Sequence, residues 1–532
     1  MSQTGSVRFV RTLSLAVRIL VELWVFQRTS RFRGRGKDQA ARRLYTRQAR
    51  RFVTFAQRMG GLVIKVGQFL SVRIDLLPDE YIRVLAELQD ALPGVATPAI
   101  IEVVERELDK PLTSLYASFD DTPVAAASLG QVHRATLKDG TDVAVKVLRP
   151  GIEGLVATDL RTIHVLLRLL DRVTTFGRHV DVAQLEADFT ATFTDELDYL
   201  KEARHAETFQ RNLLFNDHVD IPRIYWELTT RRVLTMEYMG GVPIDDFAGL
   251  ERLGVDRAEL ARNLGGLFFE MVLNDGFFHA DPHPGNVFVR EGGIIELIDF
   301  GMVASVSEEA RDQYARLVLG LVRRDADGIV SSLRELGFLG PGADAKRLAG
   351  LLGPYIDTIV GDVTGFVTGR SMLDAAMSGG IPLNIDSDTL RGLQEFIYTQ
   401  PIVLPGQTTF LGKSLITIIG ICLRLDPQMD LLATAAPYVT GRGSLADPGE
   451  WVMRLINRGT EVGRDFVPTA RRFIAAAKRL ADGSMEADLA GALERQIREG
   501  QRRQTRQLAG VIAGVGGVVV LVLTLGRRGR GT

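Results

Sequence analysis

Alternation of apolar and polar side chains is clearest at 142–148, which reads DVAVKVL. Successive side chains of an extended strand point to opposite faces, so the three valines share one face while Ala144 and Lys146 share the other. The sequence KDGT at 138–141 is typical of a tight turn and makes 131–137 the partner strand of a hairpin. We therefore predict a hairpin with a lysine on the face opposite the valines.

Helical spacing is found in two longer segments. Residues 78–93 have the spacing of a helix whose end is bounded by a proline. Residues 188–209 predict one long helix that bears three acidic candidates, Glu196, Asp198 and Glu202. A solvated helix face, with its acids paired to neighbouring basic side chains, has the same pattern and is the alternative for this segment.

Two apolar runs further along predict buried strands. Residues 231–244 form an apolar strand that stops at a Gly-Gly pair, and residues 293–301 form a short strand that enters a tight turn. The chain then runs, at 302–317, directly into an amphipathic helix.

The C-terminal end has the composition of a membrane span. Residues 508–525 are eighteen consecutive uncharged and nearly all apolar residues. As a helix rising about 1.5 Å per residue they reach roughly 27 Å, close to the hydrocarbon thickness. Arginines lie on both sides, so the positive-inside rule barely discriminates, and a buried core helix is the alternative. We predict a single transmembrane helix, in which Gly510 and Gly514 are spaced to allow a homodimer contact.

The N-terminal end is basic and amphipathic. Residues 7–26 combine three arginines with aliphatic residues, Trp24 and Phe26, and a second basic run follows. A basic amphipathic helix with an aromatic edge is typical of binding to an anionic membrane surface. A solvated start of the chain is the alternative. Charges interrupt the apolar residues and no small-residue cleavage site follows, so a signal peptide is not predicted.

Composition limits the classes of function. The 532 residues are 46% hydrophobic and 24% charged, which is ordinary globular material and exceeds one compact domain. A formal net charge of -1 supplies no long-range attraction for a phosphate backbone and argues against nucleic acid as a partner. The single Cys422 excludes an internal disulfide and a cysteine-based zinc site, and its apolar surroundings predict a buried thiol.

Candidate chemistry is concentrated in HADPHPGN at 279–286 and LIDFG at 297–301. Their spacing places Asp281, Asn286 and Asp299 like the catalytic loop and magnesium loop of protein kinases. Mg²⁺ prefers oxygen ligands, which it shares between a few protein groups and the phosphates of its nucleotide. Asn286 and Asp299 are therefore the candidate ligands for Mg²⁺ bound with ATP, and Asp281 is the candidate base toward a hydroxyl or a water.

A zinc site is the alternative for the same loop. His279 and His283, with Asp281 between them, are spaced like metal ligands. Pro282 and Pro284 prevent a regular helix, however, and neither an HExxH pattern nor a cysteine lies nearby. Magnesium and nucleotide chemistry is therefore the leading hypothesis.

Together these residues resemble the UbiB/AarF/ADCK family of atypical protein-kinase-like proteins, which are tied to isoprenoid quinone biosynthesis and membrane lipid metabolism. The resemblance extends from about residue 45 to beyond residue 320 and is weak over the last third of the chain. Three further motifs carry it: Lys65-Val66-Gly67-Gln68 is similar to the KxGQ signature of a helical extension over the active site, Ala125-Ala126-Ala127-Ser128 to the alanine-rich loop that replaces a glycine-rich one, and Glu196-Leu197-Asp198 to the ExD pair.

The resemblance implies an α+β fold, bilobal and protein-kinase-like, with an N-terminal helical extension. It implies that Lys146 holds the α and β phosphates of ATP and that Glu202 is the helix glutamate that orients Lys146. The small Ala144 leaves room for a flat base on the same strand face. Order in the chain places Met236 at the gatekeeper position and Glu237 to Met239 against the adenine edge.

Departures from ordinary kinases are also informative. Alanine in place of glycine stiffens a phosphate-covering loop and adds methyl groups to it, so we expect unusual nucleotide handling. The loop at 279–281 lacks the arginine that docks a phosphorylated activation loop, and no APE signal follows. The resemblance implies that Lys65 and Gln68 face Glu196 and Asp198 across the cleft, in the space that a peptide would need. An ATPase or a small-molecule kinase is thus favoured over a protein kinase.

We therefore predict a membrane-anchored atypical kinase or ATPase that uses Mg-ATP to support the biosynthesis of an isoprenoid quinone or a related lipid. Its expected partners are ATP, a membrane lipid or quinone precursor, and enzymes of quinone biosynthesis. Its expected location is the inner, cytoplasmic membrane, with the catalytic domain in the cytoplasm. Two alternatives remain open: a protein kinase that acts on a partner protein, and a nucleotide-gated scaffold for membrane enzymes with negligible catalysis.

Six segments follow from these features. The predicted boundaries are 1–44 for the basic membrane-surface segment, 45–115 for the KxGQ-type helical extension, 116–240 for a strand-rich N-lobe with one important helix, 241–445 for a mainly helical C-lobe, 446–505 for a helical arm and 508–525 for the transmembrane helix.

Overall fold

The computed structural model describes most of the chain up to residue 440, all of it within one compact unit that spans Met1–Val452. The predicted arm at 446–505 and the predicted transmembrane helix at 508–525 lie outside the described residues. Among the helices that are described, none combines the length and the apolar character that crossing a bilayer requires. The described ranges are 5–30, 37–72, 77–85, 87–88, 94–173, 182–340, 342–353 and 406–440.

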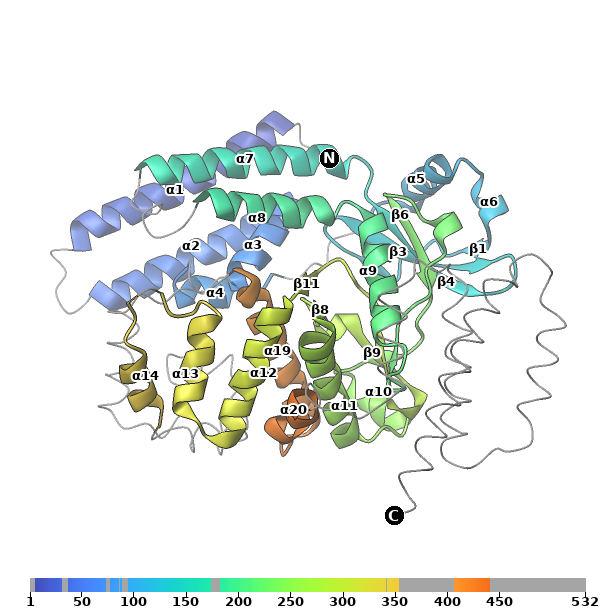
Figure 1. Ribbon diagram of the computed structural model, residues 1–532. Coiled ribbons are helices and arrows are strands. Elements are labelled where there is room, and N and C mark those ends of the chain that lie inside the picture. Colours follow the sequence, from blue (N-terminus) through green and yellow to red (C-terminus); the bar gives the residue numbers. More distant parts are fainter. Residues whose placement is uncertain are drawn as a thin grey trace, which may run out of the picture. The chain divides into compact units, whose positions relative to one another are not determined.

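The N-lobe is built on a five-stranded antiparallel sheet, in the order β1-β3-β4-β6 with β2 added to β3 (Figure 1). The three valines of β4 are fully buried against α5 (Thr97–Leu108), and Gly140 supplies the positive φ that the β3–β4 turn requires. The predicted hairpin is therefore confirmed. The strands are β1 (Tyr116–Phe119), β2 (Ala125–Ala126), β3 (Gly130–Leu137), β4 (Asp142–Leu148) and β6 (Val233–Glu237).

The prediction of one long helix at 188–209 is wrong. Helix α8 (Val182–Asp195) ends before Glu196, and α9 (Tyr199–Asn212) begins after Asp198. The Asp198 side chain accepts a hydrogen bond from the Leu200 N–H, as an N-cap residue does, so the chain turns between the two helices.

The expectation of a single important helix in the N-lobe also fails. Helix α7 (Ile152–Val173) and helix α8 precede α9 in this segment. Figure 1 shows α7 and α8 running beside the N-terminal helices. The short α6 (Leu112–Leu115) leads into β1.

The predicted extension at 45–115 is helical where the structure describes it, with α2 (Lys37–Met59), α3 (Leu62–Val72), α4 (Asp79–Leu85) and α5. Helix α1 (Gly5–Ser30) precedes it in the predicted basic segment 1–44. A buried ion pair fixes α1 on α7, because Arg8 Nε lies 2.5 Å from Asp159 Oδ1. The same guanidinium donates to the carbonyls of Met59 and Gly60 at the end of α2, so the buried charge of α1 is satisfied by two other elements.

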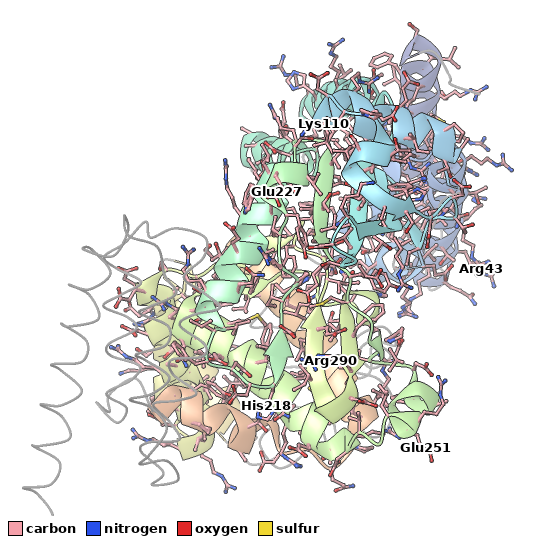
Figure 2. The ribbon with its side chains drawn as sticks, turned by 90° about the vertical axis from the view of Figure 1, so that its right-hand side faces the viewer. Arg43, Lys110, His218, Glu227, Glu251 and Arg290 are labelled. Carbon is pink, nitrogen blue, oxygen red and sulfur yellow. The ribbon has the colours of Figure 1, made fainter. Side chains whose placement is uncertain are left out.

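The C-lobe combines small sheets with helices. Figure 2 shows Lys110 on the N-lobe, and Glu251 and Arg290 on the C-lobe below it. One sheet has the order β5-β10-β9-β7 and another pairs β11 with β8. The strands are β5 (Val219–Asp220), β7 (Val242–Pro243), β8 (Phe277–His279), β9 (Val287–Arg290), β10 (Ile294–Leu297) and β11 (Val303–Ser305). The helical elements are α10 (Phe247–Arg252), α11 (Arg257–Phe269), the π-helix η4 (Glu270–Asp275), α12 (Glu308–Arg323), α13 (Ala326–Glu335), α14 (Ala345–Leu352), α19 (Gly406–Leu425) and α20 (Leu431–Thr440), with the short turns η5 (Pro284–Asn286) and η6 (Glu291–Gly293). The short η3 (Trp226–Leu228) precedes β6 and belongs to the N-lobe.

Helix α19 is part of the C-lobe core. Ile418, Ile421 and Cys422 are buried, and the Cys422 thiol donates to the Ala261 carbonyl of α11 at 3.4 Å. The prediction of a buried core thiol is confirmed. Because one face of α19 is anchored in this way, the position of the side chains on its other faces is fixed relative to α11.

Candidate active site

Two loops of the C-lobe meet because their strands are paired. Strand β8 ends at His279 and pairs with β11, while β9 pairs with β10. The loop between β8 and β9 and the loop between β10 and β11 therefore leave the sheets at the same place. The backbone N–H of Ile298 donates to the Asn286 carbonyl at 3.2 Å, which places Asn286 beside Asp299. Both side chains, together with Asp281, line one cavity.

Strand β4 brings Lys146 to the same cavity from the N-lobe. Its ammonium lies 2.5 Å from Glu202 Oε1 and 3.4 Å from Asp299 Oδ2. The same Glu202 oxygen accepts a hydrogen bond from the Phe300 N–H at 3.3 Å. Glu202 therefore ties strand β4, helix α9 and the loop after β10 to one another.

The charges of this cluster are mutually stabilised. Burial disfavours the Lys146 ammonium, but Asp299 and Glu202 outweigh that penalty and raise the pKa of Lys146. Burial likewise opposes ionisation of Asp299, yet Lys146 and the hydrogen bond from the Gly301 N–H hold the pKa of Asp299 below its usual range. The pair is therefore charged at neutral pH, as phosphate and cation binding require.

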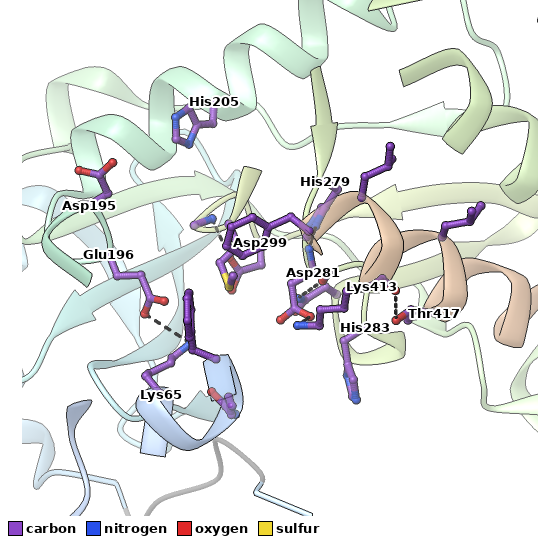
Figure 3. Close-up of a pocket in the computed structure, with 18 of the residues that line it drawn as sticks. Lys65, Asp195, Glu196, His205, His279, Asp281, His283, Asp299, Lys413 and Thr417 are labelled. Carbon is purple, nitrogen blue, oxygen red and sulfur yellow. Dashed lines mark hydrogen bonds and ion pairs between the residues drawn. The ribbon is translucent and has the colours of Figure 1, made fainter. Parts of the chain in front are cut away.

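The candidate base, Asp281, is held by three contacts. Its backbone N–H donates to His279 Nδ1 at 3.1 Å, and its carbonyl accepts from Asn286 Nδ2 at 3.1 Å. Its carboxylate faces the ammonium of Lys413 (Figure 3), and Asp281 Oδ1 lies 2.7 Å from Lys413 Nζ. Burial opposes its ionisation, but Lys413, together with Lys65 and His279, lowers the pKa of Asp281. Asp281 is thus an ionised acceptor directed into the cavity.

The KxGQ segment lies on α3, which lines the cavity opposite Asp281. Lys65 Nζ lies 3.4 Å from Glu196 Oε2 (Figure 3), and Gln68 Nε2 donates to the Leu88 carbonyl at 3.3 Å. A side chain on Gly67 would meet Leu88 and Phe52, with its Cβ only 2.2 Å from Leu88 Cδ1. The glycine of the signature therefore allows α3 to pack closely.

Asp198 does not take part in this contact. Its carboxylate caps α9 and lies 3.4 Å from Arg231, and the residue is not among those that line the cavity. The break between α8 and α9 explains the difference, because it directs Glu196 into the cavity and leaves Asp198 at a helix N-terminus. The resemblance implied that both acids face α3, and only Glu196 does.

The alanine-rich segment forms a tight hairpin over the cavity. Ala125 and Ala126 pair with β3, and the Ala127 carbonyl accepts from Arg149 Nε at 3.0 Å. At the tip, Ser128 is almost fully buried and its hydroxyl has no hydrogen-bond partner among the described residues. A buried hydroxyl without a partner is costly. It lines the cavity and is positioned to donate to a bound oxyanion such as phosphate.

The cavity has a volume of about 1320 Å³ and is lined by both polar and apolar side chains. The apolar side chains come from α3, α8, the end of α11, η4, α12 and α19. They include Phe69, Phe193, Phe268, Val272, Leu317 and Phe410. The π-helix η4 follows α11 in this lining, a type of local irregularity that is often found at functional sites.

The predicted adenine-binding residues lie outside this lining. Ala144 and Met236 are buried partners across β4 and β6, and neither they nor Glu237 and Met239 are among the residues that line the cavity. The Glu237 N–H already donates to the Arg223 carbonyl at 2.8 Å. Contact of Glu237 to Met239 with adenine therefore stays a prediction.

The histidines of the loop serve as local hydrogen-bond acceptors. His279 Nδ1 accepts from Asp281, and His283 Nδ1 accepts from the Gly285 N–H at 3.1 Å. No cluster of three or more His, Cys, Asp or Glu side chains suited to a metal ion occurs in the part of the chain that the structure describes. The zinc alternative therefore has no structural support there.

Sequence analysis did not identify Lys413 as a residue of the site. It belongs to the last third of the chain, where the motifs cease, and it lies 132 positions beyond the carboxylate that it contacts. The local sequence LGKSLITI predicts a helix face and nothing more. Only the packing of α19 on α11 identifies Lys413 as a residue of the site.

Comparison with known proteins gives consistent matches. The sequence model described as "ABC1 atypical kinase-like domain" matches residues 87–333. An uncharacterised protein of Synechocystis is 32% identical over 472 residues, which cover 88% of this chain and 78% of that protein. The "Probable protein kinase UbiB" of Marinobacter nauticus is 33% identical over 387 residues, which cover 72% and 68%.

A plant relative and a solved structure extend this list. "Protein ACTIVITY OF BC1 COMPLEX KINASE 8, chloroplastic" of Arabidopsis thaliana is 35% identical over 397 residues, 72% of this chain and 52% of that protein. The structure of Rv3197 in complex with erythromycin, from Mycobacterium tuberculosis, has a TM-score of 0.51 at 24% identity and covers 75% of this chain and 97% of that one. This likeness supports the kinase-like fold.

Proposed function

Because the chain belongs to the UbiB/ABC1 family of atypical kinase-like proteins, we propose that it binds Mg-ATP in the cavity between its lobes and transfers the terminal phosphoryl group. The acceptor is water or the hydroxyl of a small hydrophobic compound. The observation that carries the proposal is the convergence of Lys146, Glu202 and Asp299, which come from three separate elements.

The charges of the cavity fit a nucleotide with its metal ion. Lys201 and Asp195 line the cavity as an ion pair. Apart from this pair, three lysines and four carboxylates line it. Each lysine lies next to a carboxylate of its own: Lys65 next to Glu196, Lys146 next to Glu202 and Lys413 next to Asp281. Asp299 is the additional carboxylate, and with the amide oxygen of Asn286 it forms the oxygen donor set that a hard divalent cation prefers.

Each residue then has a defined task in phosphoryl transfer. Lys146, oriented by Glu202, binds the α and β phosphates, and the Ser128 hydroxyl donates to a phosphate oxygen. Asn286 and Asp299 would hold Mg²⁺, which when bound would neutralise charge on the phosphates. Asp281 orients the acceptor hydroxyl and takes its proton. The acceptor oxygen bonds to the γ-phosphorus while the bond to the β,γ-bridging oxygen breaks, and ADP leaves.

A hydrophobic acceptor is favoured over a peptide by the walls of the cavity. Helix α3 with Lys65 and Gln68 occupies the side opposite Asp281, and the remaining walls are largely aromatic and aliphatic. We propose an isoprenoid quinone precursor or a related membrane lipid as the compound that is acted on or bound there. The apolar walls and the family resemblance support this substrate class.

We also propose that the protein works at the cytoplasmic face of the inner membrane. Two sequence features support this location: the apolar run at 508–525 and the basic amphipathic segment that forms α1. A hydrophobic substrate would then reach the cavity from the bilayer.

Phosphate release from Mg-ATP by the purified full-length protein tests the proposal. We expect release that is stimulated by lipid or by a phenolic quinone precursor and is lost in Asp299→Asn, because the amide removes the anionic metal ligand. Asp121→Asn is the matched control, because it makes the same change in an exposed carboxylate of the loop between β1 and β2. Unchanged release in Asp299→Asn would show that the site is assigned wrongly.

A further inference from the structure

The loop between Asp281 and Asn286 supplies no positive charge of its own. Its residues are Pro282, His283, Pro284 and Gly285, and Lys or Arg is absent from the whole 279–286 segment. Phosphoryl transfer nevertheless places negative charge on the three equatorial oxygens of the moving group, which enzymes stabilise with lysine or arginine as well as with metal ions. The task assigned to Lys146 concerns the α and β phosphates. A protein cation that acts on the γ-phosphoryl group beside Mg²⁺ would therefore have to come from another part of the chain.

Helix α19 supplies one. Its Lys413 ammonium lies 2.7 Å from Asp281 Oδ1, the carboxylate that faces the acceptor (Figure 3). The γ-phosphorus and the acceptor oxygen come within bonding distance of each other during transfer, so a group that touches Asp281 is also close to the γ-phosphoryl oxygens. An ammonium carries three N–H donors, and the contact with Asp281 uses one of them.

The position of Lys413 is fixed by the helix that carries it. Leu411 and Ile418 are buried on the inner side of α19, and Phe410 packs edge-on against Phe69 of α3 with ring centroids 6.4 Å apart. The Lys413 side chain is 25% exposed and lines the cavity. The lysine is therefore preorganised, which is the condition under which a charge stabilises a transition state most strongly.

We propose that Lys413 is a catalytic residue of this site, which contacts the γ-phosphoryl group of ATP and holds Asp281 toward the acceptor. The proposal rests on the proposed Mg-ATP chemistry. In the reaction, the acceptor oxygen bonds to the γ-phosphorus, the bond to the β,γ-bridging oxygen breaks, the acceptor proton passes to Asp281, and Lys413 donates to the γ-phosphoryl oxygens throughout. Helix α19 thereby contributes a catalytic residue that lies outside the kinase-like sequence motifs.

The test compares Mg-ATP with Mg-ADP, which differ only in the γ-phosphoryl group. Calorimetry on the full-length Lys413→Met protein should show Mg-ATP binding weakened by about tenfold, with Mg-ADP binding within about twofold of the wild type. Turnover of Mg-ATP should fall by about 100-fold, the usual effect of losing one preorganised donor to the transition state. Lys413→Arg should restore part of both losses because it keeps the charge.

Arg424→Met is the matched control, because it removes one exposed cation from the last turn of the same helix. It should leave both affinities and the turnover unchanged. Equal weakening of Mg-ATP and Mg-ADP by Lys413→Met, or no weakening of either, would overturn the assignment. If Lys413→Met fails to fold, Lys413→Gln, which is neutral but polar, decides: a selective loss of Mg-ATP affinity supports the assignment and an unchanged affinity overturns it. A wild-type protein without metal-dependent ATP binding would overturn the proposed function as well.

Discussion

At the scale of single residues, the site depends on charges that would be unfavourable apart. Glu202 is 5% exposed and its oxygen serves both Lys146 and the Phe300 N–H. A carboxylate at such depth is tolerated because a cation and a hydrogen-bond donor replace its water. Removing only the cation leaves the carboxylate buried with Asp299 as a like-charged neighbour, so stability and nucleotide binding are linked at this position.

We expect Lys146→Met to abolish nucleotide binding and to lower the free energy of unfolding by about 3 kcal/mol, since breaking a buried ion pair on one side leaves an uncompensated charge. Adding Glu202→Met to the same chain should recover part of the loss in stability but none of the binding. Urea unfolding curves of the two variants and the wild type measure this. A double variant that is less stable than Lys146→Met would contradict the explanation.

Residues could be assigned from the sequence where the chemistry is local. The alternation of β4 directed Lys146 away from the valine face, and the spacing of the two loops identified Asp281, Asn286 and Asp299 as a group. Lys413 had no such signal, because its role arises from a contact between α19 and a loop that is remote in sequence. A single sequence carries periodicity but not the register in which distant helices pack.

At the scale of elements, two short structures determine how the cavity is covered. The turn between α8 and α9 was predicted as continuous helix because apolar residues recur at helical spacing on both sides of it. Asp198 is the physical reason for the break, since its side chain satisfies an N–H at the start of α9. An aspartate ahead of a helical run is a recognised start signal. Glu196 lies in the turn between the two helices, where it contacts Lys65 of α3.

The β2–β3 hairpin is the second such element, and it depends on Gly130. A Cβ at this position would lie 2.8 Å from the Val147 carbonyl oxygen and 2.4 Å from the Tyr199 hydroxyl. Gly130→Ala should therefore separate the hairpin from β4 and α9, with a cost of about 1 to 3 kcal/mol in stability. Because Ser128 and Lys146 lie on these elements, weaker Mg-ATP binding should accompany the loss.

Gly154→Ala is the control for that substitution. Gly154 lies in helix α7, and a Cβ there would meet nothing within 4 Å. Alanine should raise stability by about 0.5 to 1 kcal/mol, because glycine is the poorer helix former. Thermal unfolding and ATP titration of the two variants measure the effects. A Gly130→Ala protein as stable and as competent as the wild type would show that the hairpin does not need the close contact.

At the scale of the whole molecule, the proposed membrane location raises the question of which surface would contact the lipid. Helix α1 carries large apolar side chains that are exposed on one side, with Val10, Val21 and Trp24 at 61, 54 and 57% exposure. Their spacing of eleven and three residues places them on a common face of a helix. Arg28 lies over the Trp24 ring, 5.0 Å from its centroid. Apolar exposure bordered by basic residues is the pattern of a helix that lies in a membrane interface.

Site-directed labelling of the full-length protein in anionic vesicles tests this orientation. Val21→Cys should accept a fluorescent label that brominated lipid chains quench, because the apolar face of α1 enters the bilayer interface. The native Cys422 is buried and its pKa is raised to about 12, so it should not react. Raising the salt concentration should reduce the quenching, since screening weakens the attraction of Arg11 and Arg18 to anionic lipid.

The control label belongs on another exposed valine. Val322 of α12 is 45% exposed, and a label at Val322→Cys should keep its full fluorescence in the same vesicles, because no other large apolar side chain of α12 is exposed beside it. Equal quenching at positions 21 and 322 would exclude α1 as the membrane-facing element. Selective quenching at position 21 would orient the catalytic unit with α1 on the lipid surface, so that a hydrophobic acceptor could enter the apolar part of the cavity without crossing water.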